Sequence, residues 1–197
     1  MKLLFVNCCI SQRGTGSRTH ALADAFLAAF QASHPGAEIE EVTPEALLAL
    51  KPFDAKMLDR RDALAQAGDF IAPVYALAQQ FRTADAVVVA APFWDLSYPA
   101  ALRTYIEYIS AVGLTYHYTD AGCCGDCAAE HLVYLTSGGD AEREDSVGVV
   151  HWRQLAAMFG IPRFDYVFAG GLDAHPDTAG ETLAAACALA GTLAKTL

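Results

Sequence analysis

Residues 85–106 read DAVVVAAPFWDLSYPAALRTYI, and this stretch decides the fold. The β-branched run from Val87 to Val89 is typical of a strand that is buried on both faces of a sheet. Pro92 ends that strand, and Pro99 opens a helix whose apolar residues share one face. The aromatic and polar residues between the two prolines follow the carboxyl end of a buried strand, so we expect them to face a ligand.

The length and composition of the chain predict one domain spanning residues 1–197. The chain is 54% hydrophobic, and a domain of this size buries about 70% of the surface that its unfolded chain exposes. The formal net charge of −10 argues against nucleic acid and anionic membranes as partners. No run of about 18 apolar residues is present, and the opening MKLLFVNCC resembles a first strand more than a signal peptide. We therefore expect a cytoplasmic protein that does not span a membrane.

Strand and helix patterns alternate along the chain. The expected strands cover residues 2–7, 37–43, 84–91, 131–136 and 164–169. The expected helices cover residues 21–30, 44–51, 62–82 (with an interruption at Gly68 or Pro73), 99–112, 146–159 and 177–195. This alternation predicts an α/β three-layer sandwich with a five-stranded parallel sheet. Unusual loops follow the first, third and fourth strands, which favours the flavodoxin-like strand order 2-1-3-4-5.

The loop after the first strand has the composition of a phosphate site. Residues 11–19 exceed the 2–6 residues of an ordinary strand-to-helix connection and are rich in Gly, Ser and Thr. Free backbone N–H groups and the positive end of the next helix favour an anion there. Ser11, Ser17 and Thr19 offer hydroxyls to it, and either Arg13 or Arg18 offers positive charge. In the alternative interpretation, Ser17 only caps the helix. The loop lacks both the third glycine of a dinucleotide fingerprint and the Gly-Lys-Ser/Thr of a P-loop.

Two further loops suit a planar, polar heterocycle. Residues 93–96 offer an aromatic flank and backbone N–H groups at the end of the third strand. Gly138 and Gly139 allow the loop after the fourth strand to approach the same ring, because no Cβ intervenes. In the alternative interpretation, Phe93 and Trp94 fill core below the loop.

With these motifs, the chain resembles the flavodoxin-fold NAD(P)H:quinone oxidoreductases and FMN-dependent azoreductases. The matching motifs are APFWDLSYPAALRTYIEYI at 91–109, GLTYHYT at 113–119 and TSGG at 136–139. The resemblance implies non-covalent FMN, NADH or NADPH as donor, and quinones, azo compounds or related small-molecule acceptors. It also implies ping-pong hydride transfer without an essential general base, and a homodimer in which Tyr116 and Tyr118 approach the partner's flavin.

The resemblance further implies which residues contact the cofactor. Phosphate contacts fall on Cys9, Ser11, Ser17, Arg18 and Thr19. Ring contacts fall on Pro92, Phe93, Trp94, Asp95 and Leu96 and, on the pyrimidine side, on Thr136, Ser137, Gly138 and Gly139. We expect the substrate to contact Trp94, Tyr118 and His151. The family often has Ser-Ser in place of Cys8-Cys9, and Asn in place of Asp95. A carboxylate cannot donate a hydrogen bond, so we hypothesise that Asp95 lowers the flavin potential or changes acceptor preference.

Three cysteines near residue 125 form the least expected motif. Cys124 and Cys127 have the spacing of metal and redox sites, and His131 follows four residues later. Three thiols are too few for an ordinary Cys₄ cluster. Three interpretations remain open: a solvent-near loop without metal, a redox-active thiol pair, and a metal site. We adopt the first of them.

Two other functions compete with the enzyme. The first is a flavodoxin-like electron carrier, although the aromatic segment 113–122 has no evident use in a carrier. The second is a cysteine-based redox or metal protein that keeps the fold without the flavin.

Overall fold

The protein is represented by a computed structural model that describes residues 1–11, 13–141 and 146–197. A five-stranded sheet has the order β2-β1-β3-β6-β7, and every neighbouring pair is parallel. Its strands are β1 (Lys2–Asn7), β2 (Glu38–Val42), β3 (Ala86–Ala90), β6 (His131–Ser137) and β7 (Arg163–Ala169). Because β6 and β7 are the fourth and fifth strands of this sheet, the predicted order 2-1-3-4-5 is confirmed.

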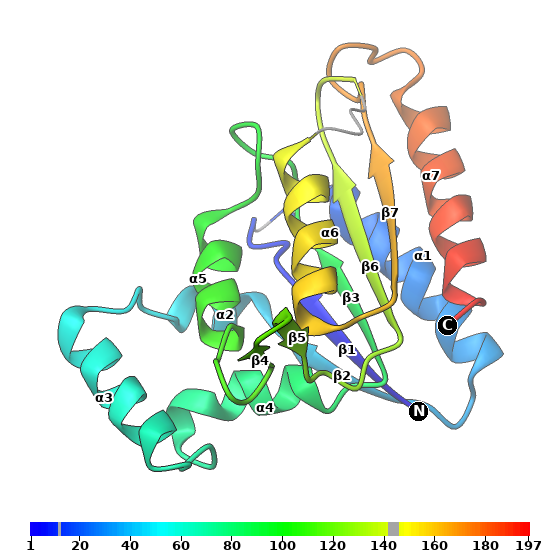
Figure 1. Cartoon of the computed structure of the whole chain (residues 1–197). Coiled ribbons are helices and arrows are strands. Elements are labelled where there is room, and N and C mark those ends of the chain that lie inside the picture. The colour runs from blue at the N-terminus through cyan, green and yellow to red at the C-terminus, as the bar shows by residue number, and fades with distance from the viewer. Residues whose placement is uncertain (12, 142–145) are drawn as a thin grey trace.

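Helices cover both faces of the sheet (Figure 1). The described helices are α1 (Arg18–Ser33), α2 (Pro44–Ala49), α3 (Ala55–Gln66), α4 (Ala76–Arg82), α5 (Ala100–Ile109), α6 (Val147–Phe159) and α7 (Ala179–Ala194), with 3₁₀ turns η1 (Gly14–Gly16) and η2 (Pro73–Tyr75). Of these, α3 stands away from the sheet (Figure 1). Side chains of β1 alternate between two cores, as the period of two in a strand requires. Leu3 and Phe5 pack in the cluster of α1 and α7, whereas Leu4 and Val6 pack in that of α5 and α6.

The helix predicted at 62–82 differs from the structure at its start. α3 begins at Ala55, where the carboxylate of Asp54 accepts a hydrogen bond of 2.8 Å from the backbone N–H of Met57. No residue of α3 is fully buried, and Leu64 and Ala65 near its end are only partly buried against the cluster of Tyr75, so the start of the helix gives a weak apolar signal. The predicted interruption is confirmed, because α3 ends before Gly68 and η2 begins at Pro73.

A second, two-stranded antiparallel sheet was not predicted. It pairs β4 (Tyr116–Thr119) with β5 (Gly122–Gly125), so the expectation of a loop for residues 122–125 was wrong. β5 packs closely on the carboxyl end of α6, and a Cβ at Gly125 would lie 1.9 Å from the carbonyl carbon of Phe159. Only glycine fits there, and this close contact holds the β4–β5 hairpin against α6, in the helical layer that covers the main sheet.

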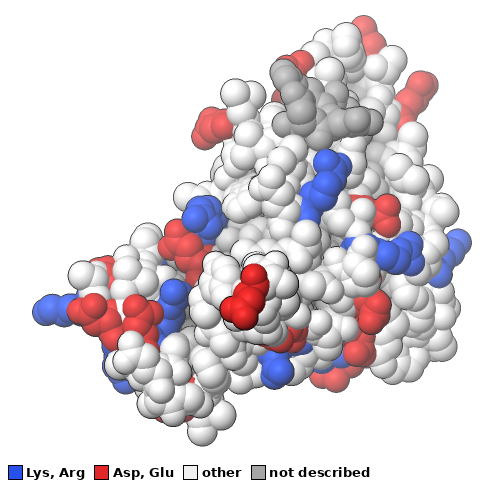
Figure 2. Space-filling view, viewed as in Figure 1, with Lys and Arg blue, Asp and Glu red and all other residues white. Residues whose placement is uncertain are grey.

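The charged side chains lie on the surface of the protein (Figure 2). Figure 2 shows one face, on which basic side chains stand singly or beside acidic ones rather than in a continuous basic patch. Among the helices described, none combines the length and the apolar character that a membrane span needs.

Candidate functional site

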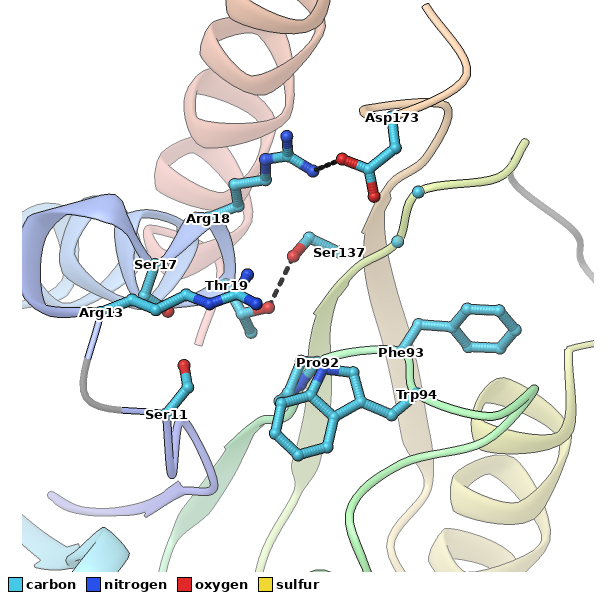
Figure 3. Close-up of a pocket in the computed structure, with 12 residues that line it drawn as sticks. Ser11, Arg13, Ser17, Arg18, Thr19, Pro92, Phe93, Trp94, Ser137 and Asp173 are labelled. Atoms are coloured by element: carbon cyan, nitrogen blue, oxygen red, sulfur yellow. Dashed lines mark hydrogen bonds and ion pairs between the residues drawn. The ribbon is translucent and has the colours of Figure 1, made fainter. Parts of the chain in front are cut away.

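A pocket lies at the carboxyl edge of the sheet, over the ends of β1, β3 and β6 (Figure 3). These three strands adjoin one another, and the chain leaves β1 and β3 toward opposite faces, which is where ligands bind in open parallel sheets. The residues that line the pocket are Ser11, Arg13, Ser17, Arg18, Thr19, Pro92, Phe93, Trp94, Ser137, Gly138, Gly139 and Asp173. The three loops singled out in the sequence are therefore brought together.

The first side of the pocket is the amino end of α1. Ser17 is the N-cap of this helix, and its hydroxyl accepts a hydrogen bond of 3.4 Å from the backbone N–H of His20. The backbone N–H groups of Arg18 and Thr19 have no partner within the described parts of the chain. These free donors and the helix dipole favour an anion at this end. Capping and anion binding are thus compatible roles for Ser17.

Two side-chain bridges connect α1 to the β6–β7 side of the pocket. The hydroxyls of Thr19 and Ser137 form a buried hydrogen bond of 2.6 Å. Above it, Nη1 of Arg18 lies 2.7 Å from Oδ1 of Asp173, and the close-up shows both bridges (Figure 3). Arg18 is half-buried and Asp173 is exposed, so this ion pair is weak on its own, but it joins the two side chains across the pocket.

The second side of the pocket is the loop after β3. Residues 94–97 form a tight turn in which the backbones of Trp94 and Ser97 bond each other in both directions, at 3.2 and 2.8 Å. Its central residues, Asp95 and Leu96, have φ values of 50° and 63°, a conformation that costs a side chain about 1 kcal/mol or more at each position. Such strain is common at ligand sites. Trp94 is 38% exposed and lines the pocket, so it is not core.

The glycine pair closes the third side. A Cβ on Gly138 would meet the rings of Phe93 and Phe168 at 3.1 Å, and one on Gly139 would meet Oδ2 of Asp173 at 2.3 Å. Phe93 itself packs edge-on against Phe168, with ring centroids 5.4 Å apart. The glycines therefore allow the loops after β3 and β7 to close around the end of β6.

Several expected site residues lie outside this pocket. Asp95 and Leu96 are exposed at the tip of their turn, and Thr136 is buried within β6. Cys9 lines a neighbouring cavity behind η1 rather than the main pocket. Burial raises the pKa of the Cys9 thiol to about 12, so it is a neutral packing group.

Of the three residues expected to contact substrate, Trp94 lines the pocket, and the other two have different settings. His151, in the second turn of α6, bonds the hydroxyl of Tyr98 through Nδ1. Burial, and then the positive charge of Arg103, lower the pKa of His151, which favours a neutral ring that accepts the hydroxyl proton. Tyr118 is 68% exposed on β4 and does not line the pocket in this single chain.

Sequence reasoning missed Asp173 altogether. It follows β7 in a loop with no recognisable motif, and only its contact with Gly139 and Arg18 places it in the pocket. Arg13 was considered only as an alternative to Arg18, and it too lines the pocket.

The three neighbouring cysteines face different surroundings. Cys123 is exposed, whereas Cys127 is half-buried with its thiol 3.6 Å from the carbonyl oxygen of Thr115. Burial raises the pKa of Cys127 to about 12. All three are free thiols, and His131 bonds Asp165 instead of approaching them. No group of three His, Cys, Asp or Glu side chains in residues 1–11, 13–141 and 146–197 is arranged to hold a metal ion.

A sheet of this order with a polar pocket at its β1–β3 switch defines an α/β protein of the flavodoxin-like class. A family model described as "Flavodoxin-like fold" matches residues 1–192. An FMN-dependent NADH:quinone oxidoreductase of Clostridium acetobutylicum is 30% identical over 187 residues, with 87% of each chain covered. One from Pseudomonas fluorescens is 32% identical over 182 residues, again with 87% of each covered. A crystal structure of an azoreductase from Bacillus anthracis has a TM-score of 0.88 at 26% identity and complete coverage of both chains. The chain belongs to this family of flavodoxin-fold quinone oxidoreductases and azoreductases.

Proposed function

We propose that this protein is an FMN-dependent NADH oxidoreductase that reduces quinones, azo compounds or related small-molecule acceptors. The observation that carries the proposal is the pocket at the β1–β3 switch, which has an anion-binding end and an aromatic end. The names of the relatives state FMN dependence and NADH as donor, and the match to this chain covers most of their length.

The residues present fit the phosphate end of FMN. The backbone N–H groups of Arg18 and Thr19, which have no partner among the described residues, supply directed donors, and Ser11 and Ser17 line the same end. Together with the dipole of α1, these hydrogen-bond donors favour a charged phosphate over an uncharged ligand.

The residues present also fit the ring end. Pro92, Phe93 and Trp94 line one side and Gly138 and Gly139 the other. We propose that the strained turn at Asp95 and Leu96 lies along the edge of the flavin, and that Thr136 supports the pyrimidine side from within β6.

In the mechanism, FMN supplies the hydride chemistry, and the protein binds, orients and shields it. Trp94 and Phe93 exclude water from one side of the ring site. Tyr98 and His151 join the end of the turn to α6, so that the turn keeps its position while donor and acceptor exchange. No side chain is required to remove a proton from either substrate.

We further propose that residues 1–197 act as one domain, in the cytoplasm, as a homodimer. Tyr118 supports the dimer, because an aromatic side chain that is 68% exposed on the β4–β5 hairpin is well placed to face a partner's pocket. In that arrangement Tyr118 and Trp94 are walls of the acceptor site.

Spectroscopy and steady-state kinetics test the proposed function. The purified protein with added FMN should show the bound-flavin spectrum and should oxidise NADH when menadione is present. An electron carrier would bind FMN but show almost no NADH oxidation, and a cysteine-based protein would bind no FMN. Either result contradicts the proposal.

A further inference from the structure

An acidic side chain lines the end of the pocket that suits an anion. Asp173 belongs to the loop after β7, and its Oδ1 lies 2.7 Å from Nη1 of Arg18. A carboxylate near a phosphate is unfavourable by Coulomb's law, so the position of Asp173 needs an explanation beyond phosphate binding.

The backbone holds Asp173 in place. Its N–H donates to the carbonyl oxygen of Gly139 at 3.1 Å, and the N–H groups of Leu172 and Ala174 donate to Gly138 and Gly139 at 3.2 and 3.0 Å. The side chain also packs over Gly139, where a Cβ would come within 2.3 Å of Oδ2. These backbone hydrogen bonds and the contact with Gly139 therefore fix the position of Asp173 at the wall of the pocket.

The two arginines of the pocket differ in whether an acidic side chain pairs with them. The positive charge of Arg18 is matched by Asp173, whereas Arg13 lines the same pocket and forms no ion pair within the described residues. Figure 3 shows Arg13 pointing from the loop toward the interior of the pocket, on the side opposite Asp173. Taken together, the three side chains leave a net charge of about one positive unit.

We propose, building on the proposed FMN site, that Arg13 supplies the positive charge that binds the flavin phosphate. Asp173 is a positioning residue that holds Arg18 as a bridge across the pocket and moderates the attraction for phosphate. The affinity of the site for FMN is thus set by three side chains, one of which opposes binding.

Comparison of FMN with riboflavin isolates this effect, because riboflavin has the same ring and ribityl chain without the phosphate. Flavin is removed from the purified protein, and each flavin is titrated back by fluorescence quenching. The variants are Arg13→Gln, Arg18→Gln and Asp173→Asn. Arg153→Gln is the matched control, since Arg153 is an exposed arginine that stacks over Phe164 away from the pocket. Riboflavin binding reports that each variant is folded.

Arg13→Gln should weaken FMN binding by about tenfold or more, as expected for loss of a charge-assisted contact, and leave riboflavin binding within about twofold. Arg18→Gln should have a clearly smaller effect on FMN. Asp173→Asn should tighten FMN severalfold and leave riboflavin unchanged, because it releases Arg18 and removes the opposing charge.

Equal losses of FMN affinity in Arg13→Gln and Arg18→Gln would overturn the inference, as would weaker FMN binding in Asp173→Asn. If the unaltered protein bound neither flavin, the proposed function itself would fail. The two failures are thus distinguishable within one set of titrations.

Discussion

The hydroxyls of Thr19 and Ser137, two buried residues at the wall of the pocket, lie 2.6 Å apart and join the first turn of α1 to the end of β6. The bond fixes the distance between the phosphate end and the ring end of the pocket. Both residues also line the pocket, so loss of this bond should lower both the stability of the protein and its affinity for the ligand.

Thr19→Val should lower the free energy of unfolding by about 1–3 kcal/mol, because it leaves the Ser137 hydroxyl buried without a partner. Urea unfolding measures the change. Thr192→Val is the control, since Thr192 is an exposed helix threonine whose hydroxyl bonds only the Ala188 carbonyl. Adding Ser137→Ala to Thr19→Val should cost less than the sum of the two single changes; a strictly additive result would show that the hydroxyls do not interact.

Asp95→Asn should raise the midpoint potential of bound FMN on the order of 20 mV, or about 1 kcal/mol for a two-electron couple. Removal of a negative charge beside the flavin edge makes the reduced, anionic flavin less costly. Reductive titration measures the potential, with Asp59→Asn on the exposed helix α3 as control. An unchanged potential in Asp95→Asn would mean that this carboxylate faces solvent and not the ring.

Stability should fall on acidification through the range where an unfolded histidine gains its proton. Burial lowers the pKa of His151 and that of His131. The unfolded chain therefore takes up protons first as the pH drops below the ordinary histidine value of about 6.5, and unfolding becomes easier. Urea unfolding at pH 7.5 and pH 5.5 measures this loss.

His151→Asn should reduce this pH dependence, because one of the two contributing rings no longer titrates. Asparagine keeps a polar group near the position of Nδ1 and the Tyr98 hydroxyl. His175→Asn, in an exposed loop, is the control. If both variants lose as much stability between pH 7.5 and pH 5.5 as the unaltered protein does, the burial of His151 is not the cause of the loss in acid.

The cysteines should differ in reactivity toward a thiol reagent such as DTNB at pH 8. Cys123 is exposed and should react first, whereas Cys127 should react slowly because burial keeps its thiol protonated. Cys123→Ser should remove the fast phase, and Cys187→Ser serves as control. A fast phase carried by Cys127 would instead favour the redox-pair interpretation.

Gly125→Ala should destabilise the protein by about 1–3 kcal/mol, because the added methyl group overlaps the backbone at the end of α6. Gly180→Ala is the opposite control. Gly180 lies in the first turn of α7, and the space that a Cβ would occupy there is open, so alanine should be neutral or slightly stabilising. Thermal unfolding of the two variants checks the pair, and equal melting temperatures would mean that the hairpin can shift freely.

Much of the fold follows from the sequence because buried parallel strands leave clear signals. β1 spans the predicted 2–7, and β3 lies within the predicted 84–91. These sequence signals are weak in elements that are not buried and in elements that consist of small residues. α3 has no fully buried residue, and the Gly-Cys-Cys-Gly of β5 shows no alternation of apolar and polar side chains.

The candidate site divides in the same way. Loops that leave strands carry glycines, hydroxyls and aromatics, so composition and resemblance led to pocket residues such as Ser11, Trp94 and Gly138. The same reasoning also named Cys9, Asp95, Leu96 and Thr136, which do not line the pocket. Asp173 carries none of these signals. Its place depends on the register between β6 and β7, which pairs Ser137 with Ala169, and no local pattern encodes that.

Arg18 and Asp173 are separated by 155 positions in the chain. At a synthesis rate of about 5–20 residues per second, Asp173 is added roughly 8–30 s after Arg18. Throughout that interval the nascent chain holds both arginines of the pocket without the acid that opposes them. The balance of charge at this site is thus completed only after β7 has been synthesised.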